Sequence, residues 1–413
     1  MSVVIPFRAL RPARSFVKDV ASLPYDVLNR DEARALASGN PLSFLRVEKS
    51  EIDLEPPEGD VPEKIFAKAR ENLENLLSQG IMIQEETPCF YIYRQRMGAH
   101  EQTGIVGCAS VAEYESGRIK KHELTRADKE LERTRHVDTV NGQTGPVFLA
   151  YRSTEDLDRL VEGFKAGPPE YDFTADDGIV HTVWAVSDST AVRNLAEGLK
   201  TLEALYIADG HHRAAAACSV CRLRRQNNPG HRGDEPYNYF LSVMFPHSQL
   251  RIMDYNRAVR DLHGLDREAF LGKVEEKFEI LPDFSRKSPE AFHSFGMYLG
   301  GKWHQLVARE NLWNEADPIG RLDVSILQTH LLEPVLGIMD PRTDQRIDFI
   351  GGIRGMAELE RLVDSGNFAV AFSLFPTTLE QLMAVADAGL VMPPKSTWFE
   401  PKLRSGLFVH RLA

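Results

Sequence analysis

Hydrophobic and polar positions along the chain predict helices and strands that follow one another without a regular order. Apolar residues recur every three or four positions in the helix candidates, and glycines such as Gly39 and Gly80 follow as stop signals. Short apolar runs predict strands, and an alanine-rich helix is predicted directly after residue 210. The other predicted helices cover residues 31–38, 63–79, 126–140, 154–166, 187–200, 323–335 and 379–388, and the predicted strands cover 90–94, 104–114, 147–151, 179–186, 204–208, 239–245 and 368–375.

This order predicts an α+β (irregular α/β) protein with mixed sheets, because the elements interleave without the repeated βαβ units of a doubly wound sheet. The length of 413 residues suggests about two or three domains, or one large core with insertions. We treat residues 1–413 as a single large unit, with two lobes as the alternative, made of an N-terminal part (1–150) and a second part (151–413). The acidic, proline-containing residues 50–63 are interpreted as a solvated loop.

The composition is that of an ordinary globular protein, with 43% hydrophobic and 26% charged residues. The 49 Lys and Arg against 60 Asp and Glu give a net charge of −11, which disfavours generic binding of nucleic acid or of an anionic membrane. Four cysteines do not make a disulfide framework. The longest apolar stretch, 368–375, is far shorter than the roughly 18 to 20 residues of a membrane-spanning helix. We therefore expect a soluble, cytoplasmic protein.

The sharpest chemical signal lies where a predicted apolar strand meets a predicted helix. Five small or polar residues form this junction: Asp209, Gly210, His211, His212 and Arg213. The first turn of a helix binds anions through its N–H groups and its dipole, and Arg213 can donate a bidentate pair to a phosphate. Asp209 could hold a divalent cation. The alternative is an Asp N-cap before a solvated helix face, with Arg213 bridging to some acidic residue.

The second signal is a basic stretch around His122 and Glu123. Seven basic residues lie between Arg118 and Arg135, against four acidic ones. Such a local excess suits a small anion, for example a nucleotide or a phosphorylated metabolite. Glu123 could serve as a general base toward a substrate hydroxyl or as a metal ligand. The alternative is that Thr125 caps the following helix and that the other charges form a surface pattern.

A third candidate lies near the C-terminus, where Lys395, Ser396 and Thr397 follow two prolines. These side chains can bind a carboxylate or a phosphate, but they equally describe a loop that leads into an edge strand, and we favour the loop. Cys218 and Cys221 are spaced like a zinc or redox pair, yet they lie inside the predicted helix and lack further ligands. We interpret both cysteines as core residues.

Several short motifs occur in a characteristic order along the chain. They are Pro24-Tyr25-Asp26-Val27, Asn40-Pro41-x-Ser43-Phe44-Leu45, His122-Glu123-x-Thr125, Ala208-Asp209-Gly210-His211-His212-Arg213, and Pro393-Pro394-Lys395-Ser396-Thr397 with Pro401-Lys402-x-x-Ser405-Gly406. Over essentially the whole chain, this order resembles the domain-of-unknown-function family 1015. The His-Glu and Asp-Gly-His-His-Arg motifs alone are also similar to those of the free-serine kinases. That second resemblance implies a ParB/sulfiredoxin-like core with large insertions.

The resemblance to free-serine kinases implies a phosphotransferase that acts on L-serine or O-phosphoserine, with ATP or ADP as cosubstrate and Mg²⁺. It implies that Glu123 is the catalytic base, with His122 and Asp209 beside it, and that Asp209 lies near the metal. The implied phosphate- and nucleotide-binding residues are Gly210, His211, His212 and Arg213. We add Thr125, Arg126, Lys395, Ser396 and Thr397 as candidates for binding the substrate.

Two other functions remain open at this point. One is a non-catalytic, nucleotide-binding regulator of the ParB-like type. The other is a metal-dependent phosphohydrolase whose ligands are His211, His212, Asp209 and Glu123, although adjacent histidines on a helix point about 100° apart. In the preferred interpretation the partners are a nucleotide and a small anionic metabolite, with neither nucleic acid nor a membrane involved.

Overall fold

The computed structural model describes residues 3–412 and divides the chain into two compact units. Unit 1 is the chain up to Leu250 together with the segment from Pro401 onward, and unit 2 is Arg251–Glu400. Unit 2 is therefore an insertion in the sequence of unit 1. The bounds of the two units are set by compactness. The predicted division at residue 150 was set by the positions of the motifs, so the two divisions describe different things.

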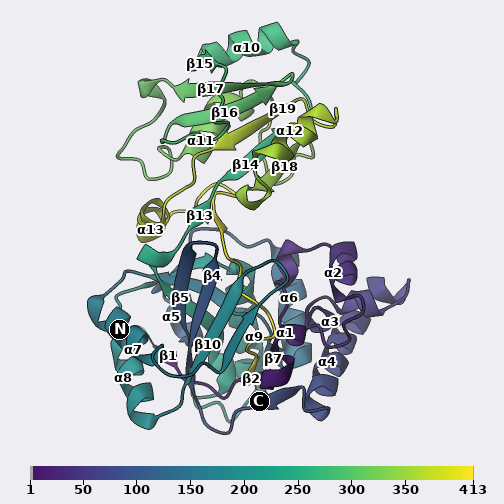
Figure 1. The fold of residues 1–413 in the computed structure, drawn as a ribbon, viewed down its shortest axis with the longest axis vertical. Coiled ribbons are helices and arrows are strands. Elements are labelled where there is room, and N and C mark those ends of the chain that lie inside the picture. Colours follow the sequence, from purple (N-terminus) through teal and green to yellow (C-terminus); the bar gives the residue numbers. More distant parts are fainter. Residues whose placement is uncertain (1–2, 413) are drawn as a thin grey trace. The chain divides into compact units, whose positions relative to one another are not determined.

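A nine-stranded sheet forms the centre of unit 1, and its strands β5, β4 and β10 lie side by side in Figure 1. Across the sheet the order is β6 (Ile119–Lys120), β11 (Leu205–Asp209), β8 (Val147–Tyr151), β12 (Tyr239–Pro246), β5 (His100–Ser110), β4 (Phe90–Met97), β10 (Val180–Val186) and β9 (Tyr171–Thr174), and β1 (Val4–Ile5) also pairs with β5. The pairs β6–β11 and β8–β12 are parallel, whereas β8–β11 and β5–β12 are antiparallel. The predicted α+β class with mixed sheets is thus confirmed, and the ParB/sulfiredoxin-like core stays a prediction.

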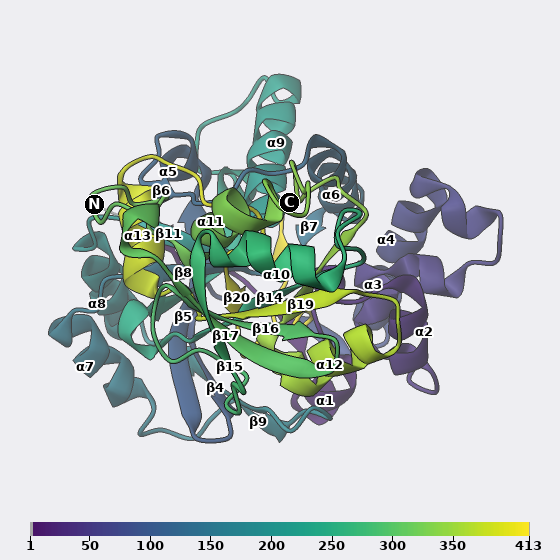
Figure 2. The same cartoon turned by 90° about the horizontal axis from the view of Figure 1, so that it is seen from above.

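Four helices pack on this sheet and bury apolar side chains in its core. They are α5 (Val111–Glu115), α7 (Glu155–Phe164), α8 (Ser189–Lys200) and α9 (His211–Asn227). Helix α7 contributes Leu157 and Val161, and α8 contributes Leu195 and Leu199, each pair at a spacing of four residues. The two helices lie next to each other in Figures 1 and 2.

A group of helices builds two smaller cores within unit 1. The group comprises α1 (Val17–Val20), α2 (Arg30–Ala37), α3 (Leu45–Glu48), α4 (Pro62–Ser78) and α6 (Ala127–Val140), and Figure 2 shows α2, α3 and α4 gathered together. Helix α4 buries Ala69, Leu73 and Leu76, which share one face. Helix α2 begins with a capping box in which Asn29 and Glu32 each accept a backbone N–H of the other residue.

The last residues of the chain complete unit 1. Paired segments include β2 (Leu10–Pro12) with β3 (Met82–Gln84) and β7 (Gly142–Gln143) with β21 (His410–Arg411). Gly406 adopts a φ of +84°, and a Cβ at this position would lie 2.6 Å from the Phe44 ring. Only glycine therefore fits where this segment crosses Phe44.

Unit 2 contains a six-stranded sheet in which all neighbouring strands are antiparallel. Its order is β15 (Phe278–Pro282), β17 (Lys302–Ala308), β16 (Ser294–Leu299), β19 (Val370–Leu374), β14 (Tyr255–Val259) and β18 (Ile347–Gly351). The other elements are α10 (Arg267–Glu275), α11 (Asp323–Leu327), α12 (Met356–Asp364), α13 (Leu379–Asp387) and the pair β13 (Ile252–Met253) with β20 (Trp398–Phe399). Leu359 and Val363 of α12 pack on Ala258 and Ala371 of the sheet.

Most predicted elements occur within a few residues of their expected bounds, but three differ. Residues 111–114, predicted to end a strand, form α5, and residues 50–63 contain two 3₁₀ turns (Ser50–Asp53 and Glu58–Asp60) within the expected loop. The helix predicted over 323–335 is α11 followed by a π-helical turn, Gln328–Leu332. Cys218 and Cys221 are buried in α9 as core residues, as predicted. Among residues 3–412, no helix is long and apolar enough to cross a membrane.

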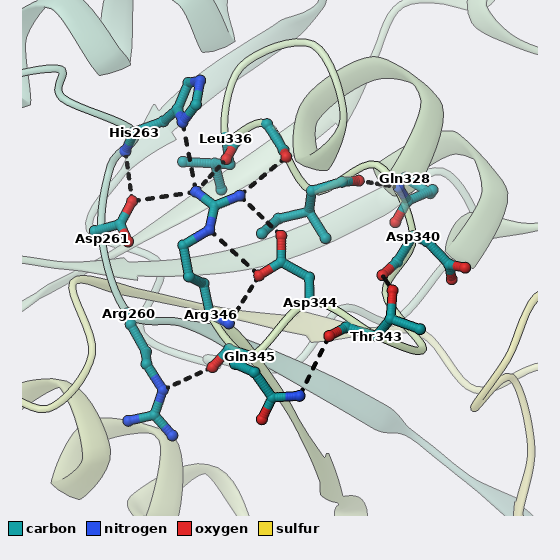
Figure 3. Close-up of polar contacts among 12 residues, drawn as sticks. Arg260, Asp261, His263, Gln328, Leu336, Asp340, Thr343, Asp344, Gln345 and Arg346 are labelled. Atoms are coloured by element: carbon teal, nitrogen blue, oxygen red, sulfur yellow. Dashed lines mark hydrogen bonds and ion pairs between the residues drawn. The ribbon is translucent and has the colours of Figure 1, made fainter.

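Arg346 ties the loop before β18 to the rest of unit 2 (Figure 3). Its guanidinium donates hydrogen bonds to the carbonyl oxygens of Leu336 and Gly337 at 3.0 and 2.9 Å. It also donates to the carboxylates of Asp344 at 2.9 Å and Asp261 at 3.4 Å. One planar side chain therefore holds three separate loop segments together.

We expect Arg346→Ala to lower the free energy of unfolding of unit 2 by about 1–3 kcal/mol, because the two carbonyls and Asp344 lose their donor. The matched control is Arg342→Ala, because Arg342 is 61% exposed and its hydrogen bonds within the described residues go to the nearby Asp340. The control should change stability by less than about 0.5 kcal/mol. Urea unfolding followed by tryptophan fluorescence measures both, and equal losses would contradict the role of Arg346.

Candidate functional site

The candidate site in unit 1 begins at the junction between β11 and α9. Strand β11 is apolar up to Asp209, and Gly210 turns the chain into α9 with a φ of +90°, a conformation that favours glycine. The Asp209 carboxylate accepts hydrogen bonds from the Gly210 N–H at 2.8 Å and from Lys402 Nζ at 3.1 Å. Burial would raise the pKa of Asp209, but Lys402 and Arg213 hold it well below its usual range.

This engagement of Asp209 bears on its predicted role as a metal ligand. Both carboxylate oxygens already have donors, and one donor is an ammonium group that would repel a bound cation. Asp209 therefore does not fit a Mg²⁺ ligand in this arrangement. Lys402, which belongs to the last of the sequence motifs, serves as the counter-ion of Asp209.

The structure brings the His122–Glu123 pair next to this junction. Strand β6 runs parallel to β11 with Ile119 opposite Leu205, so the residues that follow the two strands emerge at the same edge of the sheet. Oε2 of Glu123 lies 4.0 Å from Nδ1 of His211, and 40% of the Glu123 side chain is exposed. The His122 and His211 rings meet edge to face, with centroids 4.5 Å apart.

Both of these imidazoles are buried and neutral. Burial lowers the pKa of His122 to about 4, against the opposing effects of a hydrogen bond to the Ile207 backbone and of the charge on Asp209. Burial, reinforced by the neighbouring His122, also holds the pKa of His211 well below its ordinary value. At neutral pH the site therefore contains a carboxylate beside two uncharged rings, and each ring keeps a nitrogen lone pair.

Thr125 and Arg126 lie beside the same junction. The Arg126 N–H donates to Nε2 of His212 at 3.1 Å, although the two residues are 86 positions apart in the sequence. The Arg126 guanidinium is 67% exposed and pairs with Asp128 at 2.9 Å. The Thr125 hydroxyl donates to Glu130, and α6 has no side-chain cap, so the alternative in which Thr125 caps this helix is wrong.

Arg213 pairs with an acidic residue, Asp26, as the alternative interpretation of the sequence expected. Its guanidinium donates to both carboxylate oxygens of Asp26, at 2.8 and 2.7 Å, and to the Pro146 carbonyl at 2.7 Å. Only 6% of its side chain is exposed. In this arrangement the terminal nitrogens of Arg213 are engaged inside unit 1, and its predicted role as a phosphate ligand stays a prediction.

Next to Arg213 lies a buried charge cluster that the sequence did not predict. Glu48 and Arg133 form an ion pair with side chains 0% and 5% exposed and an N–O distance of 2.7 Å. The Tyr25 ring contacts the guanidinium groups of both Arg133 and Arg213, at 4.4 and 5.6 Å. The sequence offered one signal, the Pro-Tyr-Asp motif that contains Tyr25 and Asp26, and no signal for Glu48.

A cavity of about 10 Å³ borders this cluster, and Arg133 and Arg213 both line it. The Nε atoms of these two arginines have no hydrogen-bond partner among the described residues. The volume corresponds to about one water molecule, so the cavity is too small for a metabolite.

Lys395, Ser396 and Thr397 belong to unit 2, and their predicted role in binding the substrate stays a prediction. The Lys395 carbonyl accepts a hydrogen bond from Arg257 at 2.9 Å. The Ser396 hydroxyl donates to the Pro393 carbonyl at 2.6 Å, and the Ser396 carbonyl accepts from Thr377 at 3.0 Å. These bonds fix the backbone of the loop.

Comparison with known proteins establishes the family of the chain. The family described as "Protein of unknown function (DUF1015)" matches residues 4–325, so the chain belongs to this family. No curated protein matches the chain.

Several solved structures match weakly. A free serine kinase in complex with AMP has 14% identity and a TM-score of 0.35, over 68% of this chain and 83% of that chain. A conserved hypothetical protein from Pyrococcus furiosus has 14% identity and a TM-score of 0.35, over 70% and 90% of the two chains. C-terminally truncated SbnI from Staphylococcus aureus has 11% identity and a TM-score of 0.37, over 73% and 85%. Similarities at this level establish neither a shared fold nor a shared ligand.

We expect Glu48→Gln to destabilise unit 1 by about 3–5 kcal/mol at neutral pH, because it leaves the buried Arg133 without a counter-ion. Burial alone would raise the pKa of Glu48, but Arg133 outweighs burial and lowers it to about 2. Because the folded-state pKa is depressed, the stabilisation is present above the unfolded pKa of 4.5 and is lost as the pH falls through about 2. The difference between wild type and Glu48→Gln should therefore shrink as the solution is acidified.

Urea unfolding at a series of pH values between about 7 and 2 measures this difference. Glu63→Gln is the control, because the Glu63 side chain is 74% exposed and its ion pair with Arg135 spans 3.7 Å. A stability loss in Glu48→Gln no larger than that of the control would contradict the assignment.

Proposed function

We propose that this chain transfers a phosphoryl group between an adenine nucleotide and the hydroxyl group of a small hydroxy-amino acid, L-serine, with O-phosphoserine as the phosphorylated form. The observation that carries the proposal is the position of Glu123. Its carboxylate is 40% exposed and lies 4.0 Å from His211, the first residue of α9. A carboxylate there can accept a hydroxyl proton while the helix terminus binds a phosphate.

The start of α9 supplies the phosphate-binding groups of the proposal. The first four N–H groups of a helix have no partner within the helix. In α9 the N–H of the N-cap Gly210 donates to Asp209, and Gly210 itself has no side chain to cap the N–H groups that follow. The positive end of the helix dipole adds to the attraction for an anion. Gly210 adopts the left-handed conformation at the turn from β11 into α9.

Arg126 replaces Arg213 as the cation in this proposal. Its backbone N–H donates to His212. Its side chain is 67% exposed and forms an ion pair with Asp128, whose side chain is 61% exposed. Exposed pairs of this kind contribute little free energy, so the guanidinium can turn toward a ligand at small cost. Arg213, in contrast, is itself buried and would have to leave both Asp26 and the Pro146 carbonyl.

In the transfer, the substrate hydroxyl oxygen forms a bond to the transferred phosphorus, and the bond from that phosphorus to the bridging oxygen of the nucleotide breaks. Glu123 takes the hydroxyl proton. The N–H groups of α9 and the Arg126 guanidinium offset the charge on the phosphoryl oxygens. Mg²⁺ would supply charge neutralisation to the nucleotide phosphates, and no residue of this chain is assigned to it.

Two features support the choice of nucleotide and of serine. The His-Glu and Asp-Gly-His-His-Arg motifs are similar to those of the free-serine kinases, and in the structure these two motifs lie together. The second feature is cationic: Lys120 and Arg152 lie 5.7 and 5.8 Å from the ring of Tyr206 in β11, the strand that leads to the junction, and cations suit an anionic ligand such as a nucleotide.

The full chain with Mg²⁺ should convert L-serine and ATP or ADP to O-phosphoserine, and the reverse mixture should give serine. Phosphorus NMR follows O-phosphoserine, and chromatography follows the nucleotide. We expect Glu123→Gln to lower kcat about 10²- to 10⁴-fold, because it removes the proton acceptor while keeping the shape of the side chain. The control is Glu132→Gln, since Glu132 lies on α6, is 58% exposed and pairs with Lys129. Equal rates in Glu123→Gln and wild type, or no turnover with either mixture, would refute the proposal.

A further inference from the structure

Three side chains with metal-binding atoms converge where β6 and β11 end. One potential ligand atom from each of His122, Glu123 and His211 lies within 4.8 Å of the other two. Across the described part of the chain, no other three His, Cys, Asp or Glu side chains bring their ligand atoms this close. This set differs from the ligands proposed from the sequence, because His122 takes the place of Asp209 and His212.

We propose that His122, Glu123 and His211 bind one divalent transition-metal ion of the Zn²⁺ class. Two imidazole nitrogens and one carboxylate oxygen form the donor set of an open, three-ligand site in which a fourth position is left for water or a substrate. Mg²⁺ does not match this set, since it prefers oxygen ligands in octahedral geometry, whereas imidazole suits zinc, cobalt and nickel.

The fold already places the two histidines side by side. Both rings are buried and meet edge to face, with centroids 4.5 Å apart. The hydrogen bond between the His122 ring and the Ile207 backbone fixes the orientation of this ring, as backbone carbonyls do for many metal-binding histidines. The fold therefore holds His122 and His211 next to each other before a metal binds.

Glu123 supplies the adjustment that coordination requires. Ligand atoms of a tetrahedral zinc site lie about 3.3 Å apart, given zinc–ligand distances of about 2.0–2.1 Å. The gap between Glu123 Oε2 and His211 Nδ1 is 4.0 Å, and the three ligand atoms lie within 4.8 Å of one another, so they must approach each other by up to about 1.5 Å. The Glu123 side chain is 40% exposed, which leaves room for that movement and an opening for the ion to enter.

Metal binding and base catalysis compete for one carboxylate. With the ion bound, the Glu123 oxygen is engaged and cannot accept a hydroxyl proton. A corollary, which rests on the proposed function, is that Zn²⁺ inhibits serine phosphorylation. The metal site itself does not rest on turnover, because it is measured on the protein without a nucleotide.

The test uses the full chain freed of metal by a chelator, with Zn²⁺ titrated against a chromophoric competitor and with Co²⁺ as a spectroscopic probe. We expect one ion per chain, visible absorption from the cobalt form, and no displacement of Zn²⁺ by millimolar Mg²⁺. Glu123→Gln and His211→Gln should each weaken Zn²⁺ binding at least about tenfold. Circular dichroism shows whether each variant is folded, and Glu123→Gln, whose side chain is partly exposed, decides the test if His211→Gln does not fold.

The matched control is His231→Gln. His231 also pairs with a carboxylate, with its Nδ1 2.9 Å from Glu235, but belongs to no group of three ligands within the described residues. This variant should bind Zn²⁺ as wild type does. The metal site is refuted if wild type takes up no Zn²⁺, if Glu123→Gln binds it as tightly as wild type, or if His231→Gln loses it equally. Zinc binding without serine turnover would refute the proposed function and leave the metal site standing.

Discussion

The parallel pairing of β6 with β11 is the constraint on which the candidate site depends. Two residue pairs, Ile119 with Leu205 and Lys120 with Tyr206, form this ladder. Because the strands run in the same direction, the segments that follow them leave the sheet at one edge. Glu123 and His211 meet there although a helix, several strands and two further helices separate them in the sequence.

Buried charges around this edge are neutralised within unit 1. Arg133 pairs with Glu48, Arg213 with Asp26, and Lys402 with Asp209, and the cations of all three pairs have side chains no more than 10% exposed. Burying a single charge costs several kcal/mol, so each cation must have its carboxylate nearby. The partners come from the N-terminal helices, from the sheet and from the C-terminal segment. Asp26 and Asp209 are partly exposed, at 35% and 31%, but their charges are engaged by these cations. Glu123, at 40%, lies beside the uncharged His211 ring.

That carboxylate connects the two proposals. A carboxylate beside neutral imidazoles can accept a proton or coordinate a metal, and both uses draw on the same lone pairs. Family membership in DUF1015 does not choose between them, because the family is defined without a function. The choice depends on which ligand occupies the site. Imidazole nitrogens prefer a zinc-class ion over the Mg²⁺ that accompanies a nucleotide, so the two ions can be distinguished by their affinity for the site.

The sequence alone determined the local elements and the chemically important residue types. The apolar spacing in α4, α7 and α8 and the run of β11 are local patterns, so these elements could be predicted without knowledge of their neighbours. The junction at Gly210 was also predictable, because a glycine directly between an apolar strand and an alanine-rich helix indicates a sharp turn of the backbone. Only the tertiary structure decided which partner each charged group takes. Arg213 faces Asp26 and not a ligand, and Asp209 faces Lys402, because strand pairing and burial, which involve residues distant in the sequence, determine which charges must neutralise each other.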